Sequence, residues 1–262
     1  MANILDEIVA RTRLTVAERK SAAQVRELER AAAAREPRGF TQGLREAAKT
    51  RPAVIAELKK ASPSKGLLRG DYRPVEVARA YEQAGAAAIS VLTDGPYFQG
   101  SLEDLRAVSR TVAIPCLRKD FMVDRFQMLE ARAAGADAVL LIVAAHDDRT
   151  LLELAEAAHE FELDVLVEVH NGAELERGMQ LGAEMIGVNC RDLTTMQMLP
   201  HAHEELVGAM PSNVLRVAES GVKDAADIAR LLAAGYDAFL VGETLMRHEN
   251  PGAMLGQLIG LQ

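Results

Sequence analysis

Five ionisable side chains at or near the ends of short apolar runs could carry out acid–base chemistry. They are two lysines and three carboxylates: Glu57, Lys59, Lys119, Glu168 and Glu219. An amine beside a carboxylate can have a shifted pKa, which general acid–base catalysis requires. Each residue taken alone is explained about equally well as a strand-end ion pair or a solvated charge. A catalytic interpretation therefore depends on whether the fold brings all five together.

Residue alternation along a strand predicts which way these side chains point. Glu57 and Lys59 are two residues apart, so they share one face of their strand. The opposite orientation would place both charges under a layer of helices, at a cost of several kcal/mol unless they are paired. Asn189 and Arg191 share a face in the same way, which leaves Cys190 facing outward as a small core residue.

Eight β-branched runs, each followed by a helix-like segment, must position these residues. They start 21 to 34 residues apart, the length of a strand, a loop and a crossover helix. The runs are AVIAELKK (53–60), AAISVLTD (87–94), IPCLRKDF (114–121), AVLLIVAA (138–145), DVLVEVHN (164–171), MIGVNCRD (185–192), LRVAESGV (215–222) and AFLVGETL (238–245). This alternation predicts an α/β fold with a parallel sheet, and eight units predict a single closed (β/α)8 TIM barrel. No GxGxxG motif follows the first run, which disfavours an open dinucleotide-binding sheet.

In such barrels the active site lies at the carboxyl ends of the strands, where the charged residues occur. The loops after the seventh and eighth strands commonly bind phosphate, and here they contain Ser220-Gly221 and Gly242-Glu243. Glycine lets backbone N–H groups approach phosphate oxygens, although each glycine alone is more often a simple tight turn. We expect the Glu243 side chain to point away from the phosphate, and the loop 62–66 to cover the site.

The first 50 residues follow a different pattern. Apolar residues recur at helical spacing from Ile4 to Val9, charged and Ala-rich sequence continues to Arg35, and Glu36 to Gly39 interrupt it. This pattern predicts one or two amphipathic helices in an N-terminal extension, residues 1–50, packed on a barrel formed by residues 51–262.

Composition and charge exclude several classes of protein. The chain has 30 Lys and Arg against 38 Asp and Glu, a formal net charge of −8, so we expect no nucleic-acid or anionic-membrane partner. Its two cysteines form no disulfide framework, and its acidic N-terminus is not a secretory signal. The longest apolar run, 138–145, is too short to cross a bilayer. We therefore expect a cytoplasmic protein.

Other polar residues give weaker signals. His201 and His203 lie two apart near a predicted helix start, where side chains diverge, so we expect a solvated face rather than a metal site. His170 follows the fifth strand and is expected in a loop role, and Asp120 is expected to anchor the loop after the third strand. No CxxC, HxxxH or HExxH motif occurs, so no metal is predicted.

Motifs along the whole barrel, in order, resemble the indole-3-glycerol phosphate synthases. They are IAELKKASPSKG (55–66), RKDFMVD (118–124), VEVHN (167–171), IGVNCRDL (186–193), AESGV (218–222) and LVGETLMR (240–247), with YFQGS (97–101) after the second strand. The resemblance implies a lyase of tryptophan biosynthesis that acts on a phosphosugar, 1-(2-carboxyphenylamino)-1-deoxyribulose 5-phosphate. It implies indole ring closure with loss of CO2 and water, without a cofactor.

The resemblance also implies roles for individual residues. Lys119 would be the general acid for ring closure, helped by Glu57. Lys59 would lie near the substrate carboxylate or phosphate and supply the acid for dehydration, and Glu168 would be a base or charge partner. Substrate binding is implied for Ser62, Phe98, Phe121, Leu140, Asn189, Arg191, Glu219 and Ser220, and phosphate binding for Gly221, Gly242 and Glu243.

Two alternatives stay open. A phosphosugar isomerase on the same fold would use an acid–base pair without Glu57 and Lys59 on the first strand. A barrel that only binds a ligand or partner would not need intact acid–base residues on the first, third and fifth strands. The expected oligomeric state is a monomer or a weak homodimer.

Overall fold

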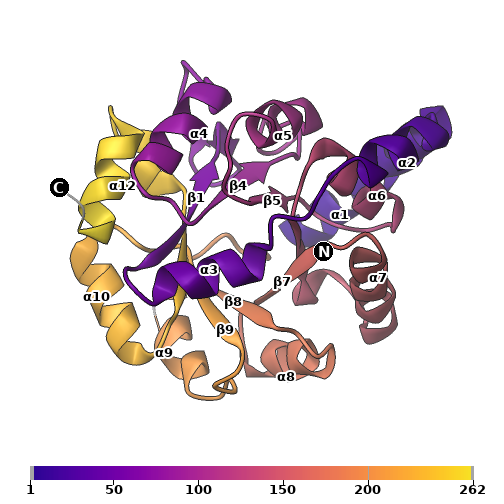
Figure 1. The fold of residues 1–262 in the computed structure, drawn as a ribbon. Coiled ribbons are helices and arrows are strands. Elements are labelled where there is room, and N and C mark those ends of the chain that lie inside the picture. Colours follow the sequence, from indigo (N-terminus) through magenta and orange to yellow (C-terminus); the bar gives the residue numbers. More distant parts are fainter. Residues whose placement is uncertain (1–2, 200, 261–262) are drawn as a thin grey trace.

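The structure, a computed structural model that describes residues 3–199 and 201–260, contains a closed barrel of parallel strands (Figure 1). Its strands are β1 (Ala53–Leu58), β4 (Ala88–Leu92), β5 (Cys116–Lys119), β6 (Ala138–Ile142), β7 (Asp164–Val169), β8 (Met185–Asn189), β9 (Leu215–Glu219) and β10 (Ala238–Val241). β1 pairs with both β4 and β10, which closes the sheet on itself. Each predicted run contains one strand, so the (β/α)8 barrel is confirmed.

Helices cover the outside of the barrel between successive strands. They are α4 (Pro74–Gln83), α5 (Leu102–Ser109), α6 (Phe126–Ala134), α7 (Asp148–Glu160), α8 (Gly172–Gln180), α9 (Ala202–Val207), α10 (Ala225–Ala234), α11 (Glu243–Arg247) and α12 (Pro251–Ile259), with a 3-10 turn η1 (Val143–Ala145). α6 and α10 end at Gly135 and Gly235, whose φ angles of 90° and 111° are left-handed. A small hairpin, β2 (Ala61–Ser62) and β3 (Gly66–Leu67), follows β1.

Side-chain alternation divides the core into two layers. On β1, Ala56 and Leu58 pack in the layer between strands and helices, whereas Ile55 packs inside the barrel. Glu57 belongs to the inward series and is buried where the barrel opens. Cys190 packs in the outer layer. The predicted orientation of both strands is therefore confirmed.

Three helices precede the barrel, so the prediction of one or two was wrong: α1 (Ile4–Ala22), α2 (Val25–Ala33) and α3 (Phe40–Ala48). α1 contributes Leu5 and Ile8 to the inner apolar layer and contacts the loops after β4 and β5. α2 packs along α6, with Ala32 against Leu129 and Ala133. The extension thus runs from one end of the barrel to the other along its outside.

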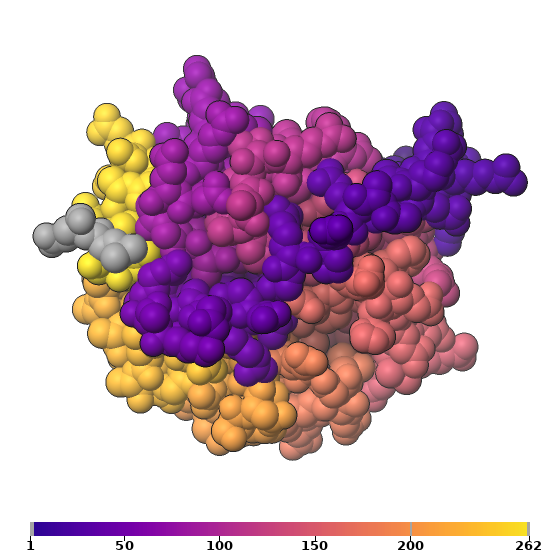
Figure 2. Space-filling model, viewed as in Figure 1, coloured from indigo at the N-terminus to yellow at the C-terminus, as the bar shows by residue number. Residues whose placement is uncertain are grey.

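The missed helix, α3, lies across the amino ends of the strands, seen in indigo in Figures 1 and 2. Its Phe40 and Leu44 are fully buried among the side chains inside the barrel. The Thr41 N–H donates to the Asp164 carboxylate at 2.7 Å, and the Arg45 guanidinium donates to the Asn213 carbonyl at 2.8 Å. α3 has only nine residues, too few for a stable isolated helix, so these tertiary contacts, which the local sequence does not show, stabilise it.

No helix among the described residues combines the length and the hydropathy needed to cross a membrane.

Candidate active site

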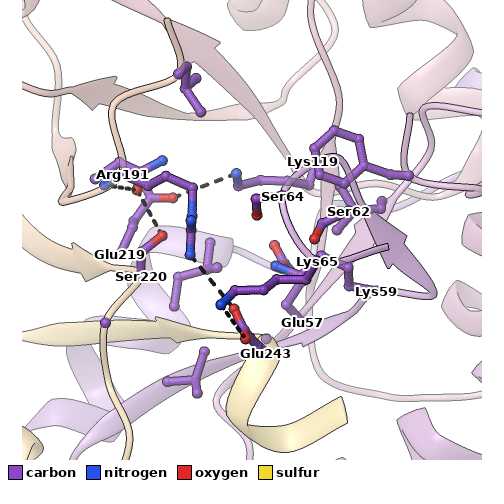
Figure 3. A pocket seen from close by; sticks show the side chains of 18 of the residues that line it. Glu57, Lys59, Ser62, Ser64, Lys65, Lys119, Arg191, Glu219, Ser220 and Glu243 are labelled. Atoms are coloured by element: carbon purple, nitrogen blue, oxygen red, sulfur yellow. Dashed lines mark hydrogen bonds and ion pairs between the residues drawn. The ribbon is translucent and has the colours of Figure 1, made fainter. Parts of the chain in front are cut away.

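A cavity of about 350 Å³ opens at the carboxyl ends of the strands (Figure 3). Every residue given a catalytic, substrate-binding or phosphate-binding role from the sequence lines this cavity. The hairpin loop contributes Ser62, Ser64 and Lys65 to its rim, as expected for a segment that covers the site. The fold therefore brings the predicted residues together, and their individual roles stay predictions.

Lys119, the last residue of β5, lies among buried carboxylates. Its Nζ atom is 3.4 Å from Glu168 Oε2 and 3.7 Å from Glu219 Oε2. Burial alone would lower the pKa of the Lys119 amine, but the attraction of Glu168, Glu219 and Glu57 outweighs burial and raises the pKa. The amine is therefore protonated throughout the neutral pH range.

The second lysine, Lys59, forms a tighter pair with the carboxylate of β1. Its Nζ atom lies 2.5 Å from Glu57 Oε1, and the Ser90 hydroxyl donates to Oε2 at 3.5 Å. Burial would raise the pKa of Glu57, but Lys59 and Lys119 outweigh it and lower the pKa. A Cβ atom at Gly242 would overlap the Glu57 carboxylate, so this position requires glycine.

The pKa values of the other two buried carboxylates are shifted in opposite directions. Burial would raise the pKa of Glu168, but Lys119 and then His170 outweigh it and lower the pKa. The pKa of Glu219 is raised well above its ordinary value by burial and by the neighbouring Glu168 charge. Neither Glu219 oxygen has a hydrogen-bond partner among the described residues. The raised pKa favours the protonated, neutral form of Glu219, whereas the lowered pKa favours a charged Glu168 beside the Lys119 ammonium.

His170 is a buried partner of Glu168, which the sequence analysis placed only in a loop role. Its Nε2 atom lies 3.4 Å from Glu168 Oε1, and its Nδ1 atom lies 2.9 Å from Glu174 Oε2. Burial would lower the pKa of His170, but Glu168 and Glu174 raise it to about 10. The spacing of two residues between Glu168 and His170 puts both on one strand face, a signal that could have identified this pair.

Asn189 and Ser220 join two strand ends at the rim of the cavity. The Ser220 hydroxyl donates to Asn189 Oδ1 at 2.8 Å, and the Arg191 backbone N–H donates to the same oxygen at 3.0 Å. Ser220 and Gly221 have φ angles of 64° and 77°, so two successive left-handed residues turn the chain sharply after β9. A left-handed non-glycine residue is strained, and such strain is common where a loop is held for binding.

The Glu243 side chain points into the rim, so the expectation that it points away is wrong. Its carboxylate lies 3.7 Å from Arg191 and 3.9 Å from Lys65, both labelled in Figure 3, and 3.2 Å from Arg247. The physical reason is electrostatic. Lys65, Arg191 and Arg247 come from separate parts of the chain, converge on this rim and attract the Glu243 carboxylate.

An apolar wall forms part of the lining of the cavity. The Phe98 and Phe121 ring centroids are 6.2 Å apart at an interplanar angle of 39°, a favourable tilted contact. Leu140 and Leu240 from β6 and β10 complete this wall. A flat ring can bind here by burial while its charged substituents face the lysines.

At the start of α9, His201 is exposed as expected, whereas His203 is buried rather than solvated. Its Nε2 atom lies 3.1 Å from the Val188 carbonyl and 3.0 Å from the Glu219 carbonyl, and its ring contacts Tyr236 edge-on. Asp120 accepts hydrogen bonds from Thr93 and from the Phe121 backbone, which confirms its anchoring role. Among residues 3–199 and 201–260, no group of His, Cys, Asp and Glu is arranged to hold a metal ion.

Comparison with known proteins identifies relatives over nearly the whole chain. The family model described as indole-3-glycerol phosphate synthase matches residues 5–258. The enzyme of that name from Koribacter versatilis (strain Ellin345) is 53% identical over 260 residues, covering 99% of this chain and 100% of the relative. The one from Polaromonas sp. (strain JS666 / ATCC BAA-500) is 47% identical over 265 residues, covering 100% of both.

Solved structures with less sequence similarity share the fold. A 3-hexulose-6-phosphate synthase superposes with a TM-score of 0.61 at 19% identity, covering 79% of this chain and 97% of that one. A thiamine phosphate pyrophosphorylase from Pyrococcus furiosus superposes with a TM-score of 0.60 at 17% identity, covering 82% of this chain and 95% of that one. At these identities the similarity concerns the barrel alone.

Proposed function

This chain belongs to the indole-3-glycerol phosphate synthase family, and we propose how the residues of its barrel mouth divide the reaction among them. The activity is that of a decarboxylating lyase of tryptophan biosynthesis. It closes the indole ring of 1-(2-carboxyphenylamino)-1-deoxyribulose 5-phosphate and releases CO2 and water. One observation carries the assignment of roles: a buried ammonium, Lys119, held among carboxylates in a cavity that also has an apolar wall.

Ring closure requires an acid at the ribulose carbonyl. As the aromatic carbon that bears the carboxylate attacks this carbonyl carbon, negative charge develops on its oxygen. We assign the donation of a proton to that oxygen to Lys119, with Glu57 helping to hold the cation. The bond to the carboxylate then breaks, its electron pair restores the aromatic ring, and CO2 leaves.

Dehydration requires a second acid and a base. The new hydroxyl leaves as water when Lys59 protonates it, while the Glu168 carboxylate accepts the proton from the neighbouring carbon, which forms the indole double bond. The pairing of Lys59 with Glu57 and of Lys119 with Glu168 supports this division. His170 acts through Glu168 as a positioning residue, because it holds one carboxylate oxygen while Glu174 holds the imidazole.

Substrate binding follows from the lining of the cavity. The anthranilate ring packs on Phe98, Phe121 and Leu140, and the sugar hydroxyls bind Asn189, Ser220 and the neutral acid Glu219. Ser62 lies on the hairpin that covers the substrate. The phosphate is held by backbone N–H groups at Gly221, Gly242 and Glu243, near the Arg191 guanidinium.

The test is product fluorescence from purified protein mixed with the proposed substrate and no added metal or cofactor. The chain contains no Trp, so indole fluorescence arises only from product. A rising signal that persists with a chelator is the expected result. Turnover of an aminoaldose phosphate without CO2 release would favour an isomerase instead, and tight binding without turnover would favour a non-catalytic barrel.

We also propose a cytoplasmic protein, a monomer or weak homodimer, in which residues 1–50 form an extension on a barrel of residues 51–262. The two buried, unpaired cysteines, Cys116 and Cys190, support a reducing compartment. Sedimentation of the purified protein tests the oligomeric state. Fractionation of cells that express it tests the location.

A further inference from the structure

A second cavity, of about 400 Å³, lies at the opposite end of the barrel from the active site. It is bounded by the connection between α2 and α3, residues 34–38, and by the segments that lead into β5 and β6. Three arginines line it, Arg35, Arg38 and Arg132, together with the acids Glu36 and Asp137. The proposed chemistry of the barrel mouth uses none of these residues.

Only one of these arginines is neutralised by a carboxylate. Arg38 lies 2.6 Å from Asp137 Oδ2, and its remaining N–H groups donate to backbone carbonyls. Arg132 is 3% exposed and donates to the carbonyls of Arg35 and Ala136. Within residues 3–199 and 201–260, no carboxylate lies within ion-pair distance of Arg132 or Arg35. Glu36, on the exposed edge of the cavity, likewise forms no ion pair there.

The cluster is therefore positive in a chain whose net charge is −8. Burial lowers the pKa of Arg35, and repulsion from Arg110, Arg38 and Arg132 lowers it further. A buried guanidinium without a counter-charge is costly, even when its N–H groups have carbonyl partners. An anion in this cavity would supply the missing charge.

We propose that this cavity binds a small anion that carries phosphate or carboxylate groups. Arg35 presents a guanidinium without a carboxylate partner, and the planar guanidinium matches phosphate and carboxylate oxygens in a two-bond contact. Arg132 supplies buried positive charge behind it. Because residues 34–38 join α2 to α3, a bound anion stabilises the packing of the extension on the barrel, through preferential binding to the folded state.

The experiment is equilibrium dialysis of radiolabelled inorganic phosphate at constant ionic strength, with indole-3-glycerol phosphate saturating the barrel mouth. The wild-type chain is expected to retain one class of phosphate site under these conditions. Arg35→Gln is expected to weaken that site about tenfold or more, the effect of one lost charged hydrogen bond. Arg26→Gln, which removes the same charge from an exposed position on α2, is the matched control and is expected to bind like wild type.

Two results would overturn the proposal. One is the absence of any phosphate site once the mouth is saturated. The other is equal weakening in Arg35→Gln and Arg26→Gln, which would show a diffuse charge effect rather than a site. A thermal unfolding scan with phosphate provides an independent readout, since the midpoint must rise more in wild type than in Arg35→Gln. Fluorescence turnover of the same Arg35→Gln protein separates this site from the chemistry at the mouth.

Discussion

The two ends of the barrel treat buried carboxylates in opposite ways. At the amino end, Asp137 accepts hydrogen bonds from the backbone N–H groups of Arg38 and Cys116 and pairs with the Arg38 guanidinium. At the mouth, neither oxygen of Glu219 has a hydrogen-bond partner among the described residues, and Glu168 Oε1 has no hydrogen bond there but lies 3.4 Å from His170 Nε2. The carboxylate oxygens of Asp137 are hydrogen-bonded within the protein and stabilise the fold. The carboxylates at the mouth still have oxygens that can hydrogen-bond to a substrate.

The difference shows that burial alone does not determine whether a carboxylate stabilises or destabilises the folded protein. A buried carboxylate with its full set of donors stabilises the fold, whereas one without donors costs free energy of folding. In a catalyst this cost is accepted where charge must be available to reacting atoms. Variants at the two ends should therefore separate stability from activity.

The largest effect is expected at Lys119. Lys119→Met removes the proposed acid but keeps most of the side-chain volume, so kcat should fall by about 10²–10⁴-fold, the usual contribution of a general acid. Product fluorescence measures the rate, and circular dichroism checks the fold. Arg45→Gln on α3 removes a cation at the amino end and should leave kcat unchanged. Near-wild-type turnover of Lys119→Met would contradict the proposed mechanism.

At the amino end the expected loss is in stability. Asp137→Asn leaves the half-buried Arg38 guanidinium without a counter-charge, so the free energy of unfolding should fall by about 3–5 kcal/mol. Urea titration measures it. The kcat of the folded protein should be unchanged, because the substitution lies at the far end of β6. A loss of kcat without a loss of stability would contradict the structural role given to Asp137.

His170 should show a smaller and pH-dependent effect. Its folded-state pKa of about 10 exceeds its ordinary value, so its stabilising contribution is fully present below the ordinary value and is lost as the pH rises through 10. The stability difference between wild type and His170→Gln should be largest below about pH 6, under the ordinary pKa of histidine, and shrink toward pH 10. Urea titrations across this range measure it.

His170→Gln also tests whether His170 positions the Glu168 carboxylate or only packs in the core. Because Glu168 loses the His170 ion-pair contact at Oε1, kcat should fall by up to about tenfold, the equivalent of about 1 kcal/mol. His203→Gln, at a buried histidine that contacts backbone carbonyls rather than a carboxylate, is the comparison variant. A stability difference independent of pH in His170→Gln would contradict the proposed Glu168–His170–Glu174 contacts.

The smallest effect on stability is expected at Glu219. Glu219→Gln replaces a buried neutral acid with a neutral amide of similar size, so the free energy of unfolding should change by no more than about 1 kcal/mol. Activity should fall, since the amide presents different donors and acceptors to the sugar hydroxyls that Glu219 is proposed to bind. Calorimetric scans and the fluorescence assay measure the two quantities. A loss as large as that of Asp137→Asn would show that Glu219 stabilises the fold after all.

The strands and the orientation of their side chains could be predicted from the sequence, because alternation with a period of two residues is a local property. The burial of His203 could not, since it depends on carbonyls of β8 and β9 and on the Tyr236 ring. The burial of Arg118 could not be predicted from the sequence either. It is fully buried beneath α6, where Asp120 and Glu130 neutralise it, and no local pattern identifies such partners.

The path of the extension has a consequence for the order of folding. Arg45 on α3 donates to carbonyls 139 and 168 residues later in the chain. These acceptors are synthesised long after α3, so the helix cannot dock while the first strands emerge from the ribosome. Contacts of such long sequence separation form late, because they close large loops. Docking of α3 is thus among the last steps, and it depends on completion of the barrel's second half.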